Sequence, residues 1–129
     1  MQSYSFKILK VLVISLFIQS IIGLTSCDEI FVEDISESTV ELIAPQNNCV
    51  SESKSITFWW KNIEDAQKYS LQIVRPSFDS PTKLIVDTLV VKTNYTLTLE
   101  NGIYEWRVAG VNNISKTQYS TYRFTISSN

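Results

Sequence analysis

The sequence contains no histidine, and this absence excludes several kinds of chemistry. Without an imidazole the protein has no Ser-His-Asp or Cys-His nucleophile system, no histidine-ligated zinc or haem, and no histidine proton shuttle. Calcium loops are also missing, since the alternating acidic residues that form them do not occur. We therefore expect a protein that is not an enzyme and that holds no metal and no cofactor.

Concentrated positive charge is missing as well. The net charge is -2 over 129 residues, and removal of Lys7 and Lys10 with a leader would leave -4, nine bases minus thirteen acids. A phosphate backbone is bound by clustered basic side chains. Because the nine remaining bases are scattered singly, we expect no nucleic-acid partner. They are Lys54, Lys61, Lys68, Arg75, Lys83, Lys92, Arg107, Lys116 and Arg123.

A long hydrophobic run is the third absence. Two lysines, Lys7 and Lys10, precede an apolar stretch at residues 11–24. As a helix this stretch would reach about 21 Å, which is short of the roughly 30 Å hydrocarbon layer of a bilayer. A positive segment followed by a short apolar core is typical of an export signal, so we interpret residues 1–26 as a signal peptide.

The apolar stretch ends in Leu24-Thr25-Ser26-Cys27, which resembles the lipobox of bacterial lipoproteins. The resemblance implies a diacylglyceryl group on the Cys27 thiol and cleavage just before this residue. Two or more acyl chains hold a protein on a membrane almost permanently. The alternative is an ordinary secretory signal with a chance cysteine. A lipidated Cys27 would make the membrane a partner and would place the protein in the cell envelope.

The residues after Cys27 bear on which membrane is involved. In some Gram-negative lineages acidic residues like Asp28-Glu29 resemble a surface-export signal, whereas in others an Asp here marks inner-membrane retention. We favour the outer membrane or cell surface over the inner membrane. Six carboxylates and no base lie between residues 28 and 41. We interpret residues 27–39 as an acidic, self-repelling linker and residues 40–129 as the folded domain.

The folded part shows no helical period. Apolar residues recur at every second position in short runs that are separated by Gly, Asn and Pro, which is the pattern of β-strands. We expect an all-β domain, a seven-stranded antiparallel immunoglobulin-like sandwich. The expected strands are residues 40–43, 55–61, 68–75, 84–91, 95–99, 103–112 and 119–127.

Alternation also predicts which side chains face the core. The members of this set are aromatic or large aliphatic residues at every second position of five strands. They are Ile56, Phe58, Trp60, Tyr69, Leu71, Ile73, Tyr95, Leu97, Leu99, Tyr104, Trp106, Val108, Tyr122, Phe124 and Ile126.

Three segments within residues 42–127 resemble strands B, C and F of a fibronectin type III-like domain. They are the sequences FWW at 58–60, AQKYSLQI at 66–73 and LENGIYEWRV at 99–108. The resemblance implies that Trp60 is the core tryptophan of strand B. It also implies that Tyr104 is a corner tyrosine whose hydroxyl bonds nearby backbone. It implies nothing about function, because such sandwiches have many roles.

Three aromatic residues are candidate ligand contacts. If Trp60 points inward, Trp59 points outward and could stack on a sugar ring or fill a partner's pocket. Packing against a neighbouring strand or the linker is the alternative. Phe78 and Tyr119 could extend such a patch from loops, or could be local anchors. Spacing alone does not place these three residues together.

Two further positions carry weaker signals. Asp87-Thr88-Leu89 resembles the short pattern of bacterial O-glycosylation, so Thr88 is a candidate modification site. Cys49 is the one thiol that remains if Cys27 is lipidated, which excludes an intramolecular disulfide. Because no base or histidine adjoins it, we expect Cys49 to be buried or inert.

We expect a lipid-anchored, non-enzymatic binding or scaffold module of the cell envelope that contacts an envelope protein or a glycan. The alternative function is a carbohydrate-binding accessory lipoprotein of a polysaccharide-uptake system, with Trp59 as the stacking platform. A hydrolase using the separated carboxylates of Asp79 and Asp87 is a third class, and it lacks any supporting motif.

Overall fold

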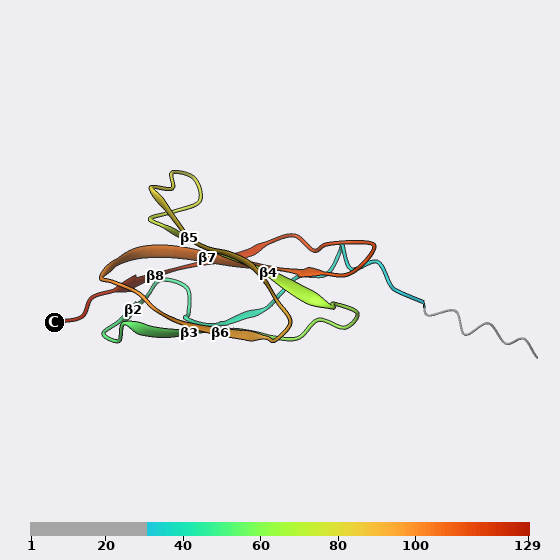
Figure 1. Cartoon of the computed structure of the whole chain (residues 1–129), viewed down its shortest axis with the longest axis horizontal. Helices are drawn as coiled ribbons and strands as arrows, with labels where there is room; N and C mark the ends of the chain where they lie inside the picture. Colours follow the sequence, from blue (N-terminus) through green and yellow to red (C-terminus); the bar gives the residue numbers. More distant parts are fainter. Residues whose placement is uncertain (1–30) are drawn as a thin grey trace, which may run out of the picture. The chain divides into compact units, whose positions relative to one another are not determined.

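A computed structural model describes residues 31–129, which form strands and connecting loops. The strands are arranged in two sheets, three-stranded β1-β3-β6 and five-stranded β2-β8-β7-β4-β5. The sheets face each other as the layers of a sandwich (Figure 1). Residues 31–129 include no helix of the length and apolarity that crossing a membrane requires. The strands are β1 Leu42–Ala44, β2 Cys49–Ser51, β3 Ser55–Trp60, β4 Lys68–Arg75, β5 Lys83–Val90, β6 Asn94–Thr98, β7 Gly102–Val111 and β8 Ser120–Ile126.

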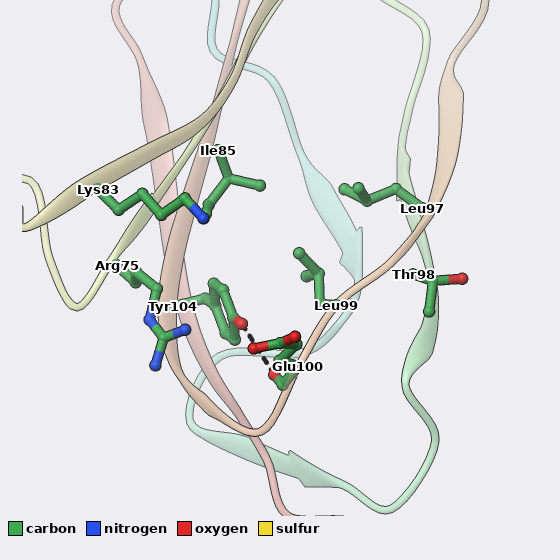
Figure 2. Close-up of a pocket in the computed structure, with 8 residues that line it drawn as sticks. All are labelled: Arg75, Lys83, Ile85, Leu97, Thr98, Leu99, Glu100 and Tyr104. Carbon is green, nitrogen blue, oxygen red and sulfur yellow. Dashed lines mark hydrogen bonds between the residues drawn. The ribbon is translucent and has the colours of Figure 1, made fainter.

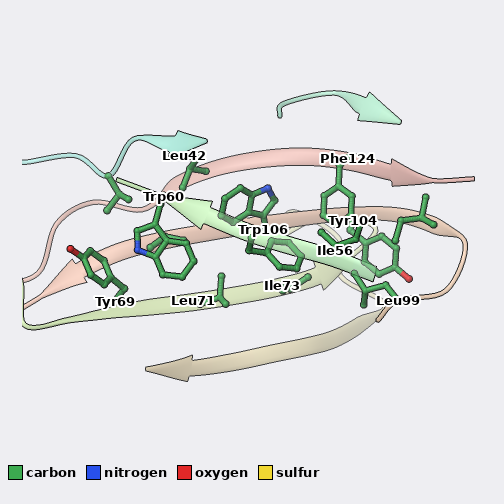
Figure 3. Close-up of a cluster of buried hydrophobic side chains, with 14 residues drawn as sticks. Leu42, Ile56, Trp60, Tyr69, Leu71, Ile73, Leu99, Tyr104, Trp106 and Phe124 are labelled. Carbon is green, nitrogen blue, oxygen red and sulfur yellow. The ribbon is translucent and has the colours of Figure 1, made fainter. Parts of the chain in front are cut away.

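The core between the sheets confirms most of the predicted inward set (Figure 3). Twelve of the fifteen side chains are buried, and Tyr95, Leu97 and Tyr122 are only half-buried against that core. Tyr95 and Leu97 lie on β6, which is an edge strand and so has a neighbour on one side only. Tyr122 lies beyond the stretch of β8 that pairs with β2. Alternation predicts the direction of a side chain, but sheet edges decide how far it is covered.

Aromatic rings pack against one another in the core. The Phe58 ring lies 5.2 Å from the Trp106 ring and 5.7 Å from the Phe124 ring, both edge-to-face. Trp60 is completely buried beside Tyr69. The Tyr104 hydroxyl donates a 2.8 Å hydrogen bond to the Glu100 carbonyl. The geometry therefore matches the core tryptophan and the corner tyrosine that the resemblance implied.

The structure contains an eighth strand that the sequence did not predict. After β1 the chain crosses to the other sheet, where Cys49, Val50 and Ser51 pair with the last residues of β8. This pairing is parallel, so the sandwich is not wholly antiparallel as expected. Asn48 enables the crossing with a positive φ of 62°, and its N–H donates to the Arg123 carbonyl. Three residues are too few to show alternation, so periodicity could not find this strand.

The expected linker is wrong in its second half, because the compact unit begins at Val32 rather than residue 40. Ile35 is buried, and its N–H donates to the Ser115 hydroxyl. The buried Asn112 amide donates to the carbonyls of Glu33 and Asp65 and accepts two backbone N–H groups from the following loop. An acidic composition predicts repulsion, but one apolar side chain and these local bonds hold the segment on the domain.

Candidate functional site

Trp59 lies on the outer face of the three-stranded sheet. Strict alternation along β3 buries Phe58 and Trp60 and leaves Trp59 49% exposed. Its register partners are Asn94 on β6 and Ala44 on β1. Among residues 31–129 its indole N–H has no hydrogen-bond partner. Trp59 therefore presents an open aromatic face and an unused donor on a regular sheet.

The residues beside Trp59 are short and polar. On the same face the Thr57 and Thr96 hydroxyls are 2.9 Å apart across the strands and form a hydrogen bond. The exposed hydroxyl and amide side chains in this row are Ser55, Thr57, Asn94, Thr96 and Thr98. Beyond the row, an exposed ion pair joins Lys61 Nζ to Glu41 Oε2 at 2.8 Å. An aromatic platform among neutral hydrogen-bonding groups suits a neutral polar ligand.

Phe78 and Tyr119 lie on the outer face of the other sheet, so the structure does not place them with Trp59. Both rings contact the same basic group, the Arg107 guanidinium of β7. Arg107 Cζ lies 4.0 Å from the centre of the Phe78 ring and 4.4 Å from that of Tyr119. The Arg107 Nε donates to Gln72 Oε1 at 2.8 Å. Both cation–π contacts stabilise this face by roughly 0.5 kcal/mol or more each.

Tyr119 is also tied by its hydroxyl. Its oxygen accepts a 2.8 Å bond from Lys116 Nζ and shares a 2.8 Å bond with the Ser70 hydroxyl. Burial raises the pKa of Tyr119. The bonds from Lys116 and Ser70 and the positive charges of Lys116 and Arg107 outweigh burial, so the pKa lies below its ordinary value near 10.

Cross-strand pairs complete this second face. The Arg123 guanidinium donates two hydrogen bonds to Glu105 Oε1, and Glu105 Oε2 accepts the Phe78 N–H at 2.8 Å. That bond holds the loop of residues 76–82, which rises above the sheet between β4 and β5 (Figure 1). Since Arg107, Arg123 and Glu105 are engaged within the domain, this face has fewer free groups for a ligand than the Trp59 face.

The other predicted positions are dispersed. Thr88 lies half-buried on β5 opposite Leu71, on the side of the strand that faces the core. Cys49 is half-buried on β2 and is a free thiol. The candidate lipidation site, Cys27, lies outside the described residues, as does the signal peptide. Within residues 31–129 there is no group of three His, Cys, Asp or Glu side chains that could hold a metal ion.

A groove at the open side of the sandwich was not predicted from the sequence (Figure 2). Its volume is about 210 Å³, and it lies between the edge strands β5 and β6. Two basic side chains, Arg75 and Lys83, line one side of it. Alternation on two separate strands gives no signal that they converge. The lining residues are Arg75, Lys83, Ile85, Leu97, Thr98, Leu99, Glu100 and Tyr104.

The fold is shared with solved fibronectin type III-like structures. No protein-family model matches the chain, and no curated protein sequence matches it. The crystal structure of FN3tt is 20% identical with a TM-score of 0.52, and the match covers 70% of this chain and 99% of that one. The CbhA fibronectin(III)-like modules of Clostridium thermocellum are 12% identical with a TM-score of 0.51, covering 70% and 98%. At these identities the similarity shows the fold alone. The chain therefore has a fibronectin type III-like β-sandwich fold.

Proposed function

We propose that this protein is a non-enzymatic binding module of the cell envelope, anchored by lipid on Cys27, that contacts an envelope protein or a glycan. The sandwich fold and the exposed Trp59 are the features that support binding. The lipobox-like sequence supports the anchor. We place it on the outer membrane or cell surface, because Asp28-Glu29 resemble the surface-export signal of some Gram-negative lineages.

The tether is short in this proposal. Residues from Val32 onward belong to the compact unit, so four residues, 28–31, lie between Cys27 and it. An extended chain spans at most about 3.5 Å per residue, so the five steps from Cys27 to Val32 would keep the start of the domain within about 17 Å of the lipidated residue. Its partner would therefore be a membrane-embedded protein or a molecule close to the membrane surface.

Two measurements test the anchor and the binding separately. Metabolic labelling with a palmitate analogue should mark the wild-type chain and leave the Cys27→Ser variant unmarked. Labelling of neither chain would refute the anchor. Pull-down of the full chain from detergent-solubilised envelopes should recover a protein or a glycan, and recovery of nothing would refute the binding role.

The second candidate function is carbohydrate binding, as in an accessory lipoprotein of a polysaccharide-uptake system. The observation that favours it is the Trp59 platform beside neutral hydroxyl and amide groups. Apolar faces of sugar rings stack on such aromatics, and neutral donors and acceptors satisfy sugar hydroxyls.

A glycan array tests this candidate directly. Wild type should bind a polysaccharide that Trp59→Ala loses, while Trp59→Tyr keeps part of the signal because an aromatic face remains. Ile114→Ala is the matched control, since Ile114 is an exposed apolar residue in the loop between β7 and β8, which belong to the other sheet. Equal binding by wild type and Trp59→Ala would remove Trp59 from the site.

A further inference from the structure

Strand β5 is the edge of the five-stranded sheet, and nothing within residues 31–129 pairs with its outer side. An edge strand presents unpaired N–H and C=O groups that can template another strand. β5 also presents apolar side chains to solvent, with Leu84 59% and Leu89 58% exposed. The strand also exposes the charged side chains Lys83 and Asp87, so its uncovered edge suits a further strand that carries both apolar and charged residues.

The edge has a regular part and a bulged part. β5 pairs with β4 without interruption from Val86 to Val90, but Ile73 is opposite Val86 while Val74 is opposite Leu84. Ile85 is therefore the extra residue of a β-bulge. At this end of the strand Lys83 and Ile85 both line the groove, where Figure 2 shows Lys83 near Arg75. The free edge thus runs directly into the basic groove.

The two cations of the groove have no carboxylate partner within the described residues, because the ion pairs there involve other bases. The Arg75 guanidinium lies 5.3 Å from the centre of the Tyr104 ring, and its hydrogen bond to the Asn101 carbonyl is long at 3.5 Å. Most of its N–H groups are therefore unused. With Glu100 as the one acidic lining residue, the groove carries a net charge of +1 (two bases minus one acid).

The size of the groove limits what it can accept. Its volume of about 210 Å³ is below the roughly 300 Å³ at which pockets for drug-sized ligands begin. Its apolar wall of Ile85, Leu97 and Leu99 and its basic side therefore suit one acidic side chain with an aliphatic stem.

We propose that the free edge of β5 binds an extended segment of a partner protein as an added strand, and that one Glu or Asp side chain of this segment enters the Arg75–Lys83 groove. The partner's backbone would pair along Val86–Val90, and its apolar side chains would cover Leu89. Main-chain hydrogen bonds would supply affinity, and the basic groove would supply specificity. This goes beyond the proposed function by naming a surface and the chemistry of its partner, and it requires neither Trp59 nor the lipid.

The experiment is a selection of random short peptides displayed on phage against the full chain in detergent. We expect enriched peptides to carry one acidic residue at a constant distance from β-branched or aliphatic residues. Lys83→Glu should weaken their binding at least about tenfold, because an exposed cation becomes an anion beside the bound carboxylate. Lys92→Glu is the matched control and should change binding less than about twofold, since Lys92 is exposed and does not line the groove.

Backbone pairing is tested on the peptide itself. The best peptide is synthesised with N-methyl groups on one alternate set of residues and then on the other. One set should abolish binding, because its N–H groups face β5, while the other set should retain it. Equal binding by both methylated peptides would overturn strand addition.

Other outcomes would also overturn the proposal. A selection without binders, or one without acidic preference, removes the peptide partner. Competition by octanoate alone, with no acidic peptide bound, would assign the groove to a small organic acid. A dimer in analytical ultracentrifugation that Lys83→Glu dissociates would show that a second copy occupies this edge.

Discussion

Replacement of Asn112 by Ala should destabilise the domain more than any surface substitution at the same end. The side chain is buried and makes five hydrogen bonds, as a donor to Glu33 and Asp65 and as an acceptor from Ile114 and Ser115. A net intramolecular hydrogen bond contributes roughly 0.5–1.5 kcal/mol. Because several freed partners would regain water, we expect a loss of about 3 kcal/mol rather than the full sum.

Urea denaturation followed by tryptophan fluorescence measures this loss. In a thermal melt the same change of about 3 kcal/mol lowers the midpoint temperature by roughly 12–24 °C in a domain of this size. Asn112→Asp keeps the acceptor and loses the donor, so its cost should lie between wild type and Asn112→Ala. The neighbouring exposed residue supplies the control, and Asn113→Ala should change stability by less than about 0.5 kcal/mol.

Hydrogen exchange gives an independent measure of the hydrogen bonds that the Asn112 side chain makes. In Asn112→Ala the amide of Ile35, which is bonded to Ser115 in the wild type, should exchange faster while amides in the middle of β7 keep their order of protection. A loss below about 1 kcal/mol, or unchanged protection at Ile35, would refute the role of Asn112 as the residue that holds the amino-terminal segment on the domain.

Three further predictions concern other parts of the domain. Ile35→Ala should cost about 2 kcal/mol in chemical denaturation, because a buried side chain is lost, and no effect would restore the linker interpretation. Gly102→Ala should cost about 1–2 kcal/mol, because φ is +154°, which residues with a Cβ rarely adopt. The new Cβ would also displace the flexible end of Arg75, whose Nη2 lies 2.7 Å away, so in a cycle with Arg75→Ala the two losses should not add. Tyr119 should ionise below pH 10 by absorbance at 295 nm against Tyr119→Phe, and Lys116→Met should move this titration upward. Since the pKa of Tyr119 is lower in the folded than in the unfolded state, ionised Tyr119 stabilises the fold above the unfolded pKa. This stabilisation is lost as the pH falls through the folded pKa. An unchanged titration in Lys116→Met would contradict Lys116 as a cause of the lowered pKa.

The alternation of apolar residues along single strands was sufficient to predict much of the fold. The side-chain period of two places Trp59 and Trp60 on opposite faces whatever the strand's neighbours are, so the buried core of β3, β4 and β7 followed from local order. The same rule leaves Arg107 and Glu105, which alternate with the predicted inward residues Tyr104, Trp106 and Val108, on the outer side of β7. The corner at Tyr104 followed from a motif that is contained within a few residues.

The order of residues along each strand was enough to predict which side chains point together, because that direction is a local property of the backbone. Which strands lie side by side followed only from the folded domain. Sheet order separated Trp59 from Phe78 and Tyr119, brought Arg75 and Lys83 to one groove, and left the outer side of β5 without a partner strand within residues 31–129. It also docked Ile35 beneath a loop eighty residues away in the chain. Such contacts depend on pairing between strands that are far apart in the sequence. Alternation does not predict this pairing, because each strand alternates in the same way beside any neighbour.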